Sequence, residues 1–259
     1  GRSVSMMGVA GVGVAPLERG RGLARSMMQR ALLEMFDREV ALSTLYAATV
    51  PLYRQCGYEH AGALFDLSVP MRALAARSPV AGGLRPPTPA QRPGRPSRSA
   101  PVDSRCAGSP RLGSQLLGEA LIGDDAAAVG GAEALAERIY KAFVRQRPGS
   151  LDRGPYVWDR VRNHRKLPVL GHLLALSDQR PPVAYVRYAL APKPDGRHDI
   201  ELQDYALTQP EGLDLIIDHL ASQRSMAHNL RWQGGCDDPL LLALDDHRGQ
   251  VELREHWML

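Results

Sequence analysis

The sequence predicts a mixed α/β (α+β) protein of two domains joined by a linker. The chain has 259 residues, of which 44% are hydrophobic and 23% charged, so it is long enough to form two ordinary cores. Short apolar strands alternate with amphipathic helices in both halves. Between them, residues 76–111 are rich in proline and arginine and have no apolar periodicity, which prevents folding. We therefore predict domains at 1–75 and 115–259 and a disordered linker at 76–114.

In the first half, the sequence predicts five elements in this order: a strand, a helix, a strand, a short helix and a strand. Residues 3–15 are mostly small or β-branched and are followed by Pro16, as expected of a buried strand. The helix that follows carries an apolar stripe at helical spacing, made of Leu23, Met27, Ala31, Leu32, Met35 and Phe36. The remaining elements are expected at 41–47, 51–55 and 63–70.

The second half repeats the alternation of strands and helices. A helix over 130–150 is stopped by Pro148 and Gly149, and Pro210 opens another. The turn-rich segments between the apolar runs separate the strands. We expect helices at 130–150, 156–162, 210–220 and 239–244, and strands at 169–176, 183–190, 199–207, 227–232 and 250–258.

Cysteine and acidic residues do not predict a metal site. Cys56, Cys106 and Cys236 are far apart, form no C-x-x-C pair and have no histidine at ligand spacing, so we expect neither zinc nor a disulfide framework. The acidic pairs at 124–125, 237–238 and 245–246 fit helix starts and turns, where carboxylates cap backbone amides. We therefore expect these pairs to be capping or solvated residues.

Membrane and nucleic-acid partners are not expected. The chain has no run of eighteen apolar residues and no secretory signal, which favours a reduced cytoplasmic protein. The net charge of +4 permits anionic partners without requiring them. The arginine-rich linker could bind nucleic acid, but it has no aromatic residue to stack on bases. We therefore interpret it as a solvated linker.

The most informative segment is GVGVAPLERGRGLARSMM, residues 11–28. It places closely spaced backbone N–H groups at a helix N-terminus, where amides and the helix dipole hold a pyrophosphate. Glycines there let phosphate oxygens approach the backbone, and arginines add charge-assisted contacts. The predicted phosphate-binding residues are Arg19, Gly20, Arg21, Gly22, Leu23 and Ala24.

Two other phosphate motifs are excluded by the same segment. A dinucleotide fingerprint needs its glycines in the turn, whereas Gly11 and Gly13 lie in the predicted strand. A nucleoside-triphosphate loop needs a G-K-[ST] ending, and no lysine is present here. The remaining alternative is an ordinary glycine-rich turn between a strand and a helix.

Taken together, these motifs resemble the GNAT superfamily of N-acyltransferases, and in particular its Eis-like (enhanced intracellular survival) branch. Residues 19–24 match the pattern [RQ]-x-x-G-x-[GA] after a V-x-V-x-P strand end, and PLYRQCGYEHAG (51–62) is similar to the Y-x-x-x-G-[FY] motif. In the second half, PGSLDRG, PVAYVRYAL, DDPLLLALDD and ELREHWML resemble the central domain of that branch. The resemblance therefore covers most of the chain outside the linker.

The resemblance implies an acetyl-CoA-dependent N-acetyltransferase. In similar enzymes the pantetheine arm lies along the strand before the phosphate loop, which implies main-chain contacts to Val12 and Val14. Tyr53 matches the tyrosine proposed to protonate the departing thiolate, although a packed core tyrosine is the alternative. Tyr58 is expected to be structural.

The acceptor implied by the resemblance is a primary amine of the aminoglycoside, polyamine or lysine type. Similar proteins are often hexameric, so a homo-oligomer is a further expectation. The second half has Gln209, Pro210 and Glu211 where a phosphate loop would need arginines and glycines. We therefore expect a degenerate, non-catalytic domain there.

The sequence also departs from the family pattern. Similar enzymes have further strands before the V-x-V strand and a C-terminal domain resembling sterol carrier proteins, so the chain looks truncated at both ends. The family's polar pair before the tyrosine motif is replaced by Ala48 and Thr49. The alternative function is therefore a non-enzymatic remnant or interaction protein that keeps the fold.

Overall fold

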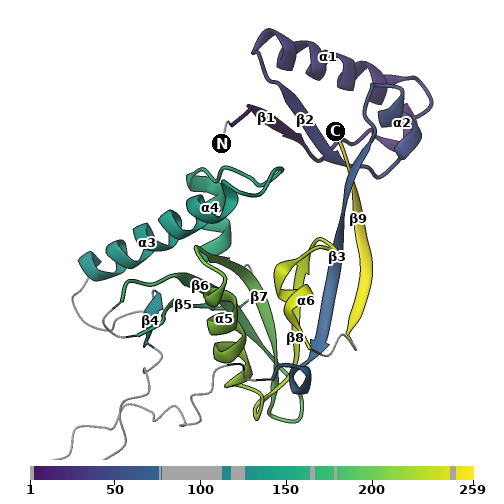
Figure 1. Cartoon of the computed structure of the whole chain (residues 1–259). Coiled ribbons are helices and arrows are strands. Elements are labelled where there is room, and N and C mark those ends of the chain that lie inside the picture. Colours follow the sequence, from purple (N-terminus) through teal and green to yellow (C-terminus); the bar gives the residue numbers. More distant parts are fainter. Residues whose placement is uncertain are drawn as a thin grey trace, which may run out of the picture.

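A computed structural model describes residues 3–75, 77, 113–117, 126–163, 167–177, 180–245 and 249–259. These residues form one nine-stranded sheet in the order β1-β2-β9-β3-β8-β7-β6-β5-β4 (Figure 1). The mixed α/β fold is therefore confirmed. Most of the predicted linker at 76–114 lies outside the described residues.

The helices and strands follow the predicted order along the chain. In the first half they are β1 (Met6–Val9), α1 (Leu23–Asp37), β2 (Leu42–Tyr46), α2 (Val50–Arg54) and β3 (His60–Pro70). In the second half they are β4 (Gly113–Leu117), α3 (Ala126–Val144), α4 (Pro155–Arg162), β5 (Val169–Ala175), β6 (Ala184–Pro192), β7 (His198–Leu207), α5 (Glu211–Ala221), β8 (Ala227–Gly234), α6 (Pro239–Ala243) and β9 (Gln250–Met258).

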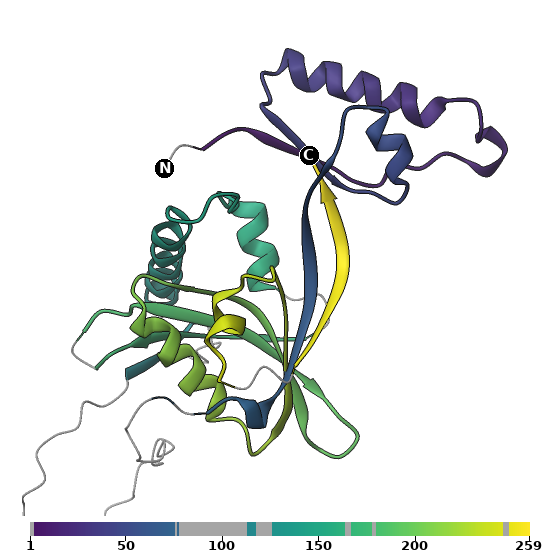
Figure 2. The ribbon, with the colours of Figure 1, turned by 45° about the vertical axis from the view of Figure 1, so that its right-hand side comes forward.

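The sheet has a small end and a large end, joined by the long ribbon of β3 and β9 (Figure 2). At the small end, α1 and α2 lie on the same face of β1 and β2. At the large end, α5 and α6 cover one face, where Leu215 and Leu240 join the main core around Ile200 and Leu230. Helices α3 and α4 cover the other face around Trp158 and Tyr185.

The last strand of the chain completes the small end of the sheet. Strand β9 lies between β2 and β3, with Leu45 opposite Met258. Beyond it, Glu59 and Leu259 exchange two backbone hydrogen bonds of 2.8 and 3.0 Å. Met258 is fully buried in a cluster with Met28, Leu45, Tyr53 and Tyr58. The core of the small end therefore depends on residues from both termini of the described chain.

A buried ion pair anchors the segment before α4 to the sheet. Arg153 donates hydrogen bonds of 2.6 and 2.8 Å to Asp204 on β7, and the Tyr185 hydroxyl donates a third at 2.6 Å. The Arg153 guanidinium also lies 3.8 Å from the centroid of the Tyr140 ring. Because every group has a partner, this network stabilises the fold rather than offering a binding site.

Two predictions about elements were wrong in detail. The first strand ends at Val9 rather than at residue 15, because Gly11 adopts a φ of 69° that breaks the extended backbone. The α1 stripe is only partly correct. Met35 is buried and Ala31 and Leu32 are half-buried, as predicted. Leu23, Met27 and Phe36 are exposed instead, and Met28, which was not in the predicted stripe, is buried. Apolar side chains occur on more than one side of α1, and the sheet covers only one side. The sequence pattern alone did not indicate which apolar residues that side contains.

The linker boundaries also differ from the prediction. Strand β4 begins at Gly113 and pairs with β5 through its backbone. At the other boundary, the Arg77 amide donates to Asp218 at 2.6 Å, and its guanidinium contacts Asp214 and Asp245. Arg77 therefore belongs to the folded part of the chain.

Within the described residues no helix is long and apolar enough to cross a lipid bilayer.

Candidate functional site

The candidate site begins where β1 and β2 stop pairing. These parallel strands are paired up to Val9 and Leu45. Beyond this point the residues after β1 leave the sheet, whereas β2 continues to Tyr46 beside β9. Val12 is half-buried and packs against the cluster that contains Tyr53, yet its main chain makes no hydrogen bond with the described residues. Val14 is also half-buried, and its carbonyl accepts a hydrogen bond from Arg19 Nε at 3.3 Å. A segment of extended backbone next to the sheet thus keeps free polar groups.

The loop before α1 presents a continuous run of unpaired amides. Gly20 and Gly22 adopt left-handed φ values of 78° and 77°, which side chains other than glycine rarely tolerate. The first hydrogen bond of the helix runs from Ser26 N–H to the Gly22 carbonyl at 3.0 Å. The six N–H groups from Gly20 to Arg25 have no acceptor among the described residues. Together with the helix dipole, unpaired amides of this kind attract an anion.

The space above this surface is open. A Cβ atom at Gly20 or Gly22 would meet nothing within 4 Å, so a ligand can reach the backbone. Arg19 and Arg21 are exposed beside it, and Arg21 forms an ion pair with Glu18. Glu18 was not among the predicted site residues, although its position three residues before Arg21 is a spacing at which ion pairs form. An anion bound here would compete with Glu18 for Arg21.

Tyr53 and Tyr58 have different roles in the cluster beneath the loop. The two rings pack edge to face with centroids 6.2 Å apart. The Tyr58 hydroxyl shares a 2.5 Å hydrogen bond with Ser43 Oγ, and burial raises the pKa of Tyr58. The Tyr53 ring is buried, but its hydroxyl makes no hydrogen bond with any described residue and is not sealed from solvent. Tyr53 is therefore the tyrosine of this pair whose hydroxyl is free to act on a ligand.

The corresponding helix start in the second half cannot hold a phosphate in the same way. At the start of α5, the amides of Gly212 and Leu213 already donate to the carbonyls of Gln209 and Pro210, both at 3.0 Å. A Cβ at Gly212 would lie 2.9 Å from Leu207 Cβ, so the turn is closed against the sheet. Glu211 and Asp214 add negative charge in the first turn.

No metal site accompanies these features in the described part of the chain, where no three potential ligands come together. Asp238 accepts hydrogen bonds from the Leu240 and Leu241 amides at 2.9 and 3.3 Å, which confirms its predicted capping role. Asp245 instead pairs with Arg77. Cys56 and Cys236 are free thiols. Asp124, Asp125, Asp246 and Cys106 lie outside the described residues.

Two segments of the chain match family models that are both described as an acetyltransferase (GNAT) domain. The first match covers residues 1–61 and the second covers residues 149–259. The first therefore contains the open loop before α1 and Tyr53, and the second contains the closed turn before α5. None of the curated proteins matches the chain.

Several solved structures share the fold over nearly the whole chain. A GCN5-related N-acetyltransferase from Anabaena variabilis is 22% identical with a TM-score of 0.71, covering 97% of this chain and 54% of its own. A probable N-acyltransferase from Enterococcus faecalis is 17% identical with a TM-score of 0.70, covering 98% and 55%. Eis1 from Mycobacterium abscessus is 20% identical with a TM-score of 0.61, covering 97% and 55%. The chain thus spans about half the length of these structures.

Proposed function

The chain contains two acetyltransferase (GNAT) domains, and we propose that the first is an acetyl-CoA-dependent N-acetyltransferase acting on a primary amine. The observation that carries this proposal is the run of six unpaired amides from Gly20 to Arg25 behind two left-handed glycines. Backbone N–H groups at a helix start can donate to phosphate oxygens without a side chain to supply the charge. The second domain supports the first through β9 and takes no part in the chemistry.

Each residue of the site has a distinct task in this proposal. The amides at positions 20–25, with Arg19 and Arg21, hold the pyrophosphate, and the main chain of Val12 and Val14 receives the pantetheine arm. Acetyl-CoA supplies the activated acetyl group. The Tyr53 hydroxyl donates a proton to the sulfur as it departs, because a phenol is protonated at neutral pH. Ala48 and Thr49 supply no base, so the amine must lose its proton to another group or to water.

We place the protein in the Eis-like branch, with an amine of the aminoglycoside, polyamine or lysine type as acceptor. The residues that support this are the phosphate loop and the tyrosine motif together with the paired second domain, and the Eis1 fold is a consistent neighbour. A panel with kanamycin, spermidine and a lysine peptide as acceptors tests it. If the chain binds acetyl-CoA but acetylates none of these three acceptors, the proposed acceptor class is contradicted.

Calorimetric titration of acetyl-CoA into the purified chain tests the phosphate site. Arg19→Glu should raise the Kd roughly tenfold to a hundredfold, because it replaces a charge-assisted contact with repulsion. Arg30→Glu is the matched control, since Arg30 is exposed on the same helix but lies two turns further on. Equal affinities of the two variants would show that acetyl-CoA does not bind at this loop.

One observation favours the alternative of a non-enzymatic interaction protein. The outer side of η1 (Pro16–Glu18) and α1 exposes large apolar side chains, including Leu17 (95% exposed) and Phe36 (79%). Exposed apolar side chains mark a protein interface where they form one contiguous patch. Under this alternative, the chain associates with another polypeptide through α1, and Phe36→Ser removes the association in sedimentation without affecting acetyl-CoA binding.

A further inference from the structure

An exposed aromatic pair lies at the end of β2, on the face of the sheet opposite α1. Tyr46 pairs with Trp257 across β2 and β9, and their rings meet edge to face at 5.1 Å. The preceding residue, Leu45, points to the other face, where it is buried beneath α1 with Met28. Because side chains alternate along a strand, Tyr46 and Trp257 face away from α1. They are 49% and 37% exposed.

In this edge-to-face pair one ring meets the edge of the other, and no described arginine lies over either ring. Five arginine contacts to aromatic rings occur among the described residues, and none of them involves Tyr46 or Trp257. Exposed aromatic rings carry a negative face that attracts ammonium and guanidinium groups. The pair therefore offers an unoccupied surface for a cation.

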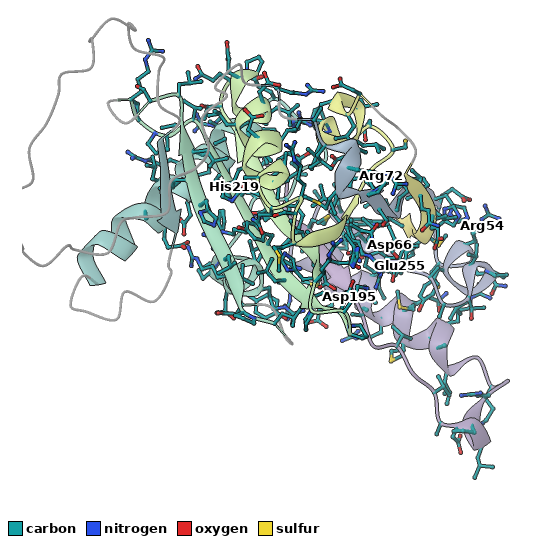
Figure 3. The ribbon with its side chains drawn as sticks, turned by 90° about the horizontal axis from the view of Figure 1, so that it is seen from below. Arg54, Asp66, Arg72, Asp195, His219 and Glu255 are labelled. Atoms are coloured by element: carbon teal, nitrogen blue, oxygen red, sulfur yellow. The ribbon has the colours of Figure 1, made fainter. Side chains whose placement is uncertain are left out.

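A carboxylate accompanies the aromatic pair. Glu255 lies two residues before Trp257 on β9, and its negative charge, after burial, is the second cause of the raised pKa of Tyr46. The nearby Arg254 is held by Asp66 on β3 through contacts of 3.1 and 3.2 Å, whereas its contact with Glu255 is 3.8 Å. Figure 3 labels the two carboxylates, Asp66 and Glu255. The Glu255 side chain is 39% exposed, so a second cation can approach it from solvent.

This cluster also lies close to the place where an acyl group would be delivered. Strands β1 and β2 stop pairing at Val9 and Leu45, and Tyr46 is the next residue. A thioester held between the separated strand ends would be open to both faces of the sheet, and α1 covers only one. An attacking amine must therefore approach from the face that carries Tyr46.

We propose that Tyr46, Trp257 and Glu255 form the subsite that binds the ammonium group of the acceptor amine. The two rings hold the cation by cation–π attraction and the carboxylate supplies charge complementarity. This inference rests on the proposed function for its catalytic meaning. It also assigns the second domain a direct part in recognition, since Trp257 and Glu255 belong to its last strand.

Tryptophan fluorescence provides a direct binding test that does not need acetyl-CoA. The chain has three tryptophans, and Trp158 and Trp232 are only 3% and 5% exposed. Spermidine should therefore change the emission of Trp257 alone, and Trp257→Phe should remove the signal. Glu255→Gln should weaken spermidine binding about tenfold, whereas Glu34→Gln, on exposed α1, should leave it unchanged. No saturable change in emission would overturn the proposal.

Acetylation kinetics separate this proposal from the acetyl-CoA site. Tyr46→Ala and Glu255→Gln should raise the KM for spermidine about tenfold and leave the Kd for acetyl-CoA unchanged. If acetyl-CoA binds and the variants acetylate spermidine like the parent, the ammonium subsite is wrong and the proposed function stands. If spermidine binds at Trp257 but acetyl-CoA does not bind, the proposed function fails instead. Emission that changes with protein concentration would show that the face joins two copies, which also overturns the subsite.

Discussion

Tyr53 and Tyr58 are five residues apart, belong to the same motif and have buried rings, but their hydroxyls differ. Ser43 engages the Tyr58 hydroxyl, whereas no described residue bonds to the Tyr53 hydroxyl. The spacing of the motif identified both positions, and it also favoured Tyr53 for catalysis. The hydrogen bond to Ser43 could not be predicted, because it depends on how β2 lies relative to the segment after α2.

Tyr53→Phe should lower kcat about a hundredfold or more, the usual effect of removing a general acid. The Tm and the Kd for acetyl-CoA should hardly change, since no protein hydrogen bond is lost. Initial rates with spermidine, together with thermal melts, check both parts. Tyr58→Phe is the matched control: it should lower the Tm by breaking the Ser43 bond. A Tyr53→Phe variant with the parent's kcat would exclude Tyr53 as the acid.

Gly22→Ala should destabilise the loop by about 1–2 kcal/mol, because an L-residue is strained at the φ of 77°. The same change should weaken acetyl-CoA binding, since the methyl group projects into the open space above the amides. Urea unfolding and calorimetry measure the two effects. Gly8→Ala, in the β1 strand with equally open space and no positive φ, should show neither effect. A fully stable Gly22→Ala variant would contradict the loop geometry.

At the scale of elements, local patterns located nearly every helix and strand, but not how the strands pair. Strand β9 was predicted from its own residues, yet nothing local indicates that it inserts between β2 and β3. Its partner residues lie about two hundred positions away in the sequence, as with Leu45 and Met258. Which strands pair, and in which register, depends on how the complete helices and strands pack together. The alternation of apolar residues within one strand does not contain this information.

Met258→Ala should destabilise the small end of the sheet by about 2–5 kcal/mol, the usual effect of removing a fully buried side chain. Because Met258 packs with Tyr53, acetyl-CoA turnover should fall as well. Leu259→Ala, at an exposed position on the same strand end, is the control and should change little. Urea unfolding followed by circular dichroism compares them. Equal stability of the two variants would mean that β9 does not complete this core.

At the scale of the whole molecule, two half-buried histidines link stability to pH. His172 on β5 and His219 on α5 have ring centroids 4.2 Å apart, and both contact the Tyr188 hydroxyl. Burial lowers the pKa of His172 to about 4 and that of His219 to about 3, with the neighbouring His172 adding to the second shift. Both side chains are therefore neutral in the folded protein at pH 5.

The unfolded chain binds protons at these histidines near pH 6.5, whereas the folded chain does so only near pH 4 and below. Between those values the unfolded state holds more protons, so the free energy of unfolding must fall as the pH is lowered from 6.5 toward 4. Thermal melts across this range measure the slope, and His219→Gln should flatten it. A Tm that rises or stays level on acidification would contradict the half-buried histidine pair.

Amide hydrogen exchange with and without CoA is the most direct test of the central claim that the unpaired amides before α1 hold the pyrophosphate. The six amides from Gly20 to Arg25 have no acceptor in the free chain, so they should exchange fast alone and become protected when CoA binds. The amides of Gly212 and Leu213, already bonded before α5, should not respond. Binding of CoA without protection at positions 20–25 would contradict the account.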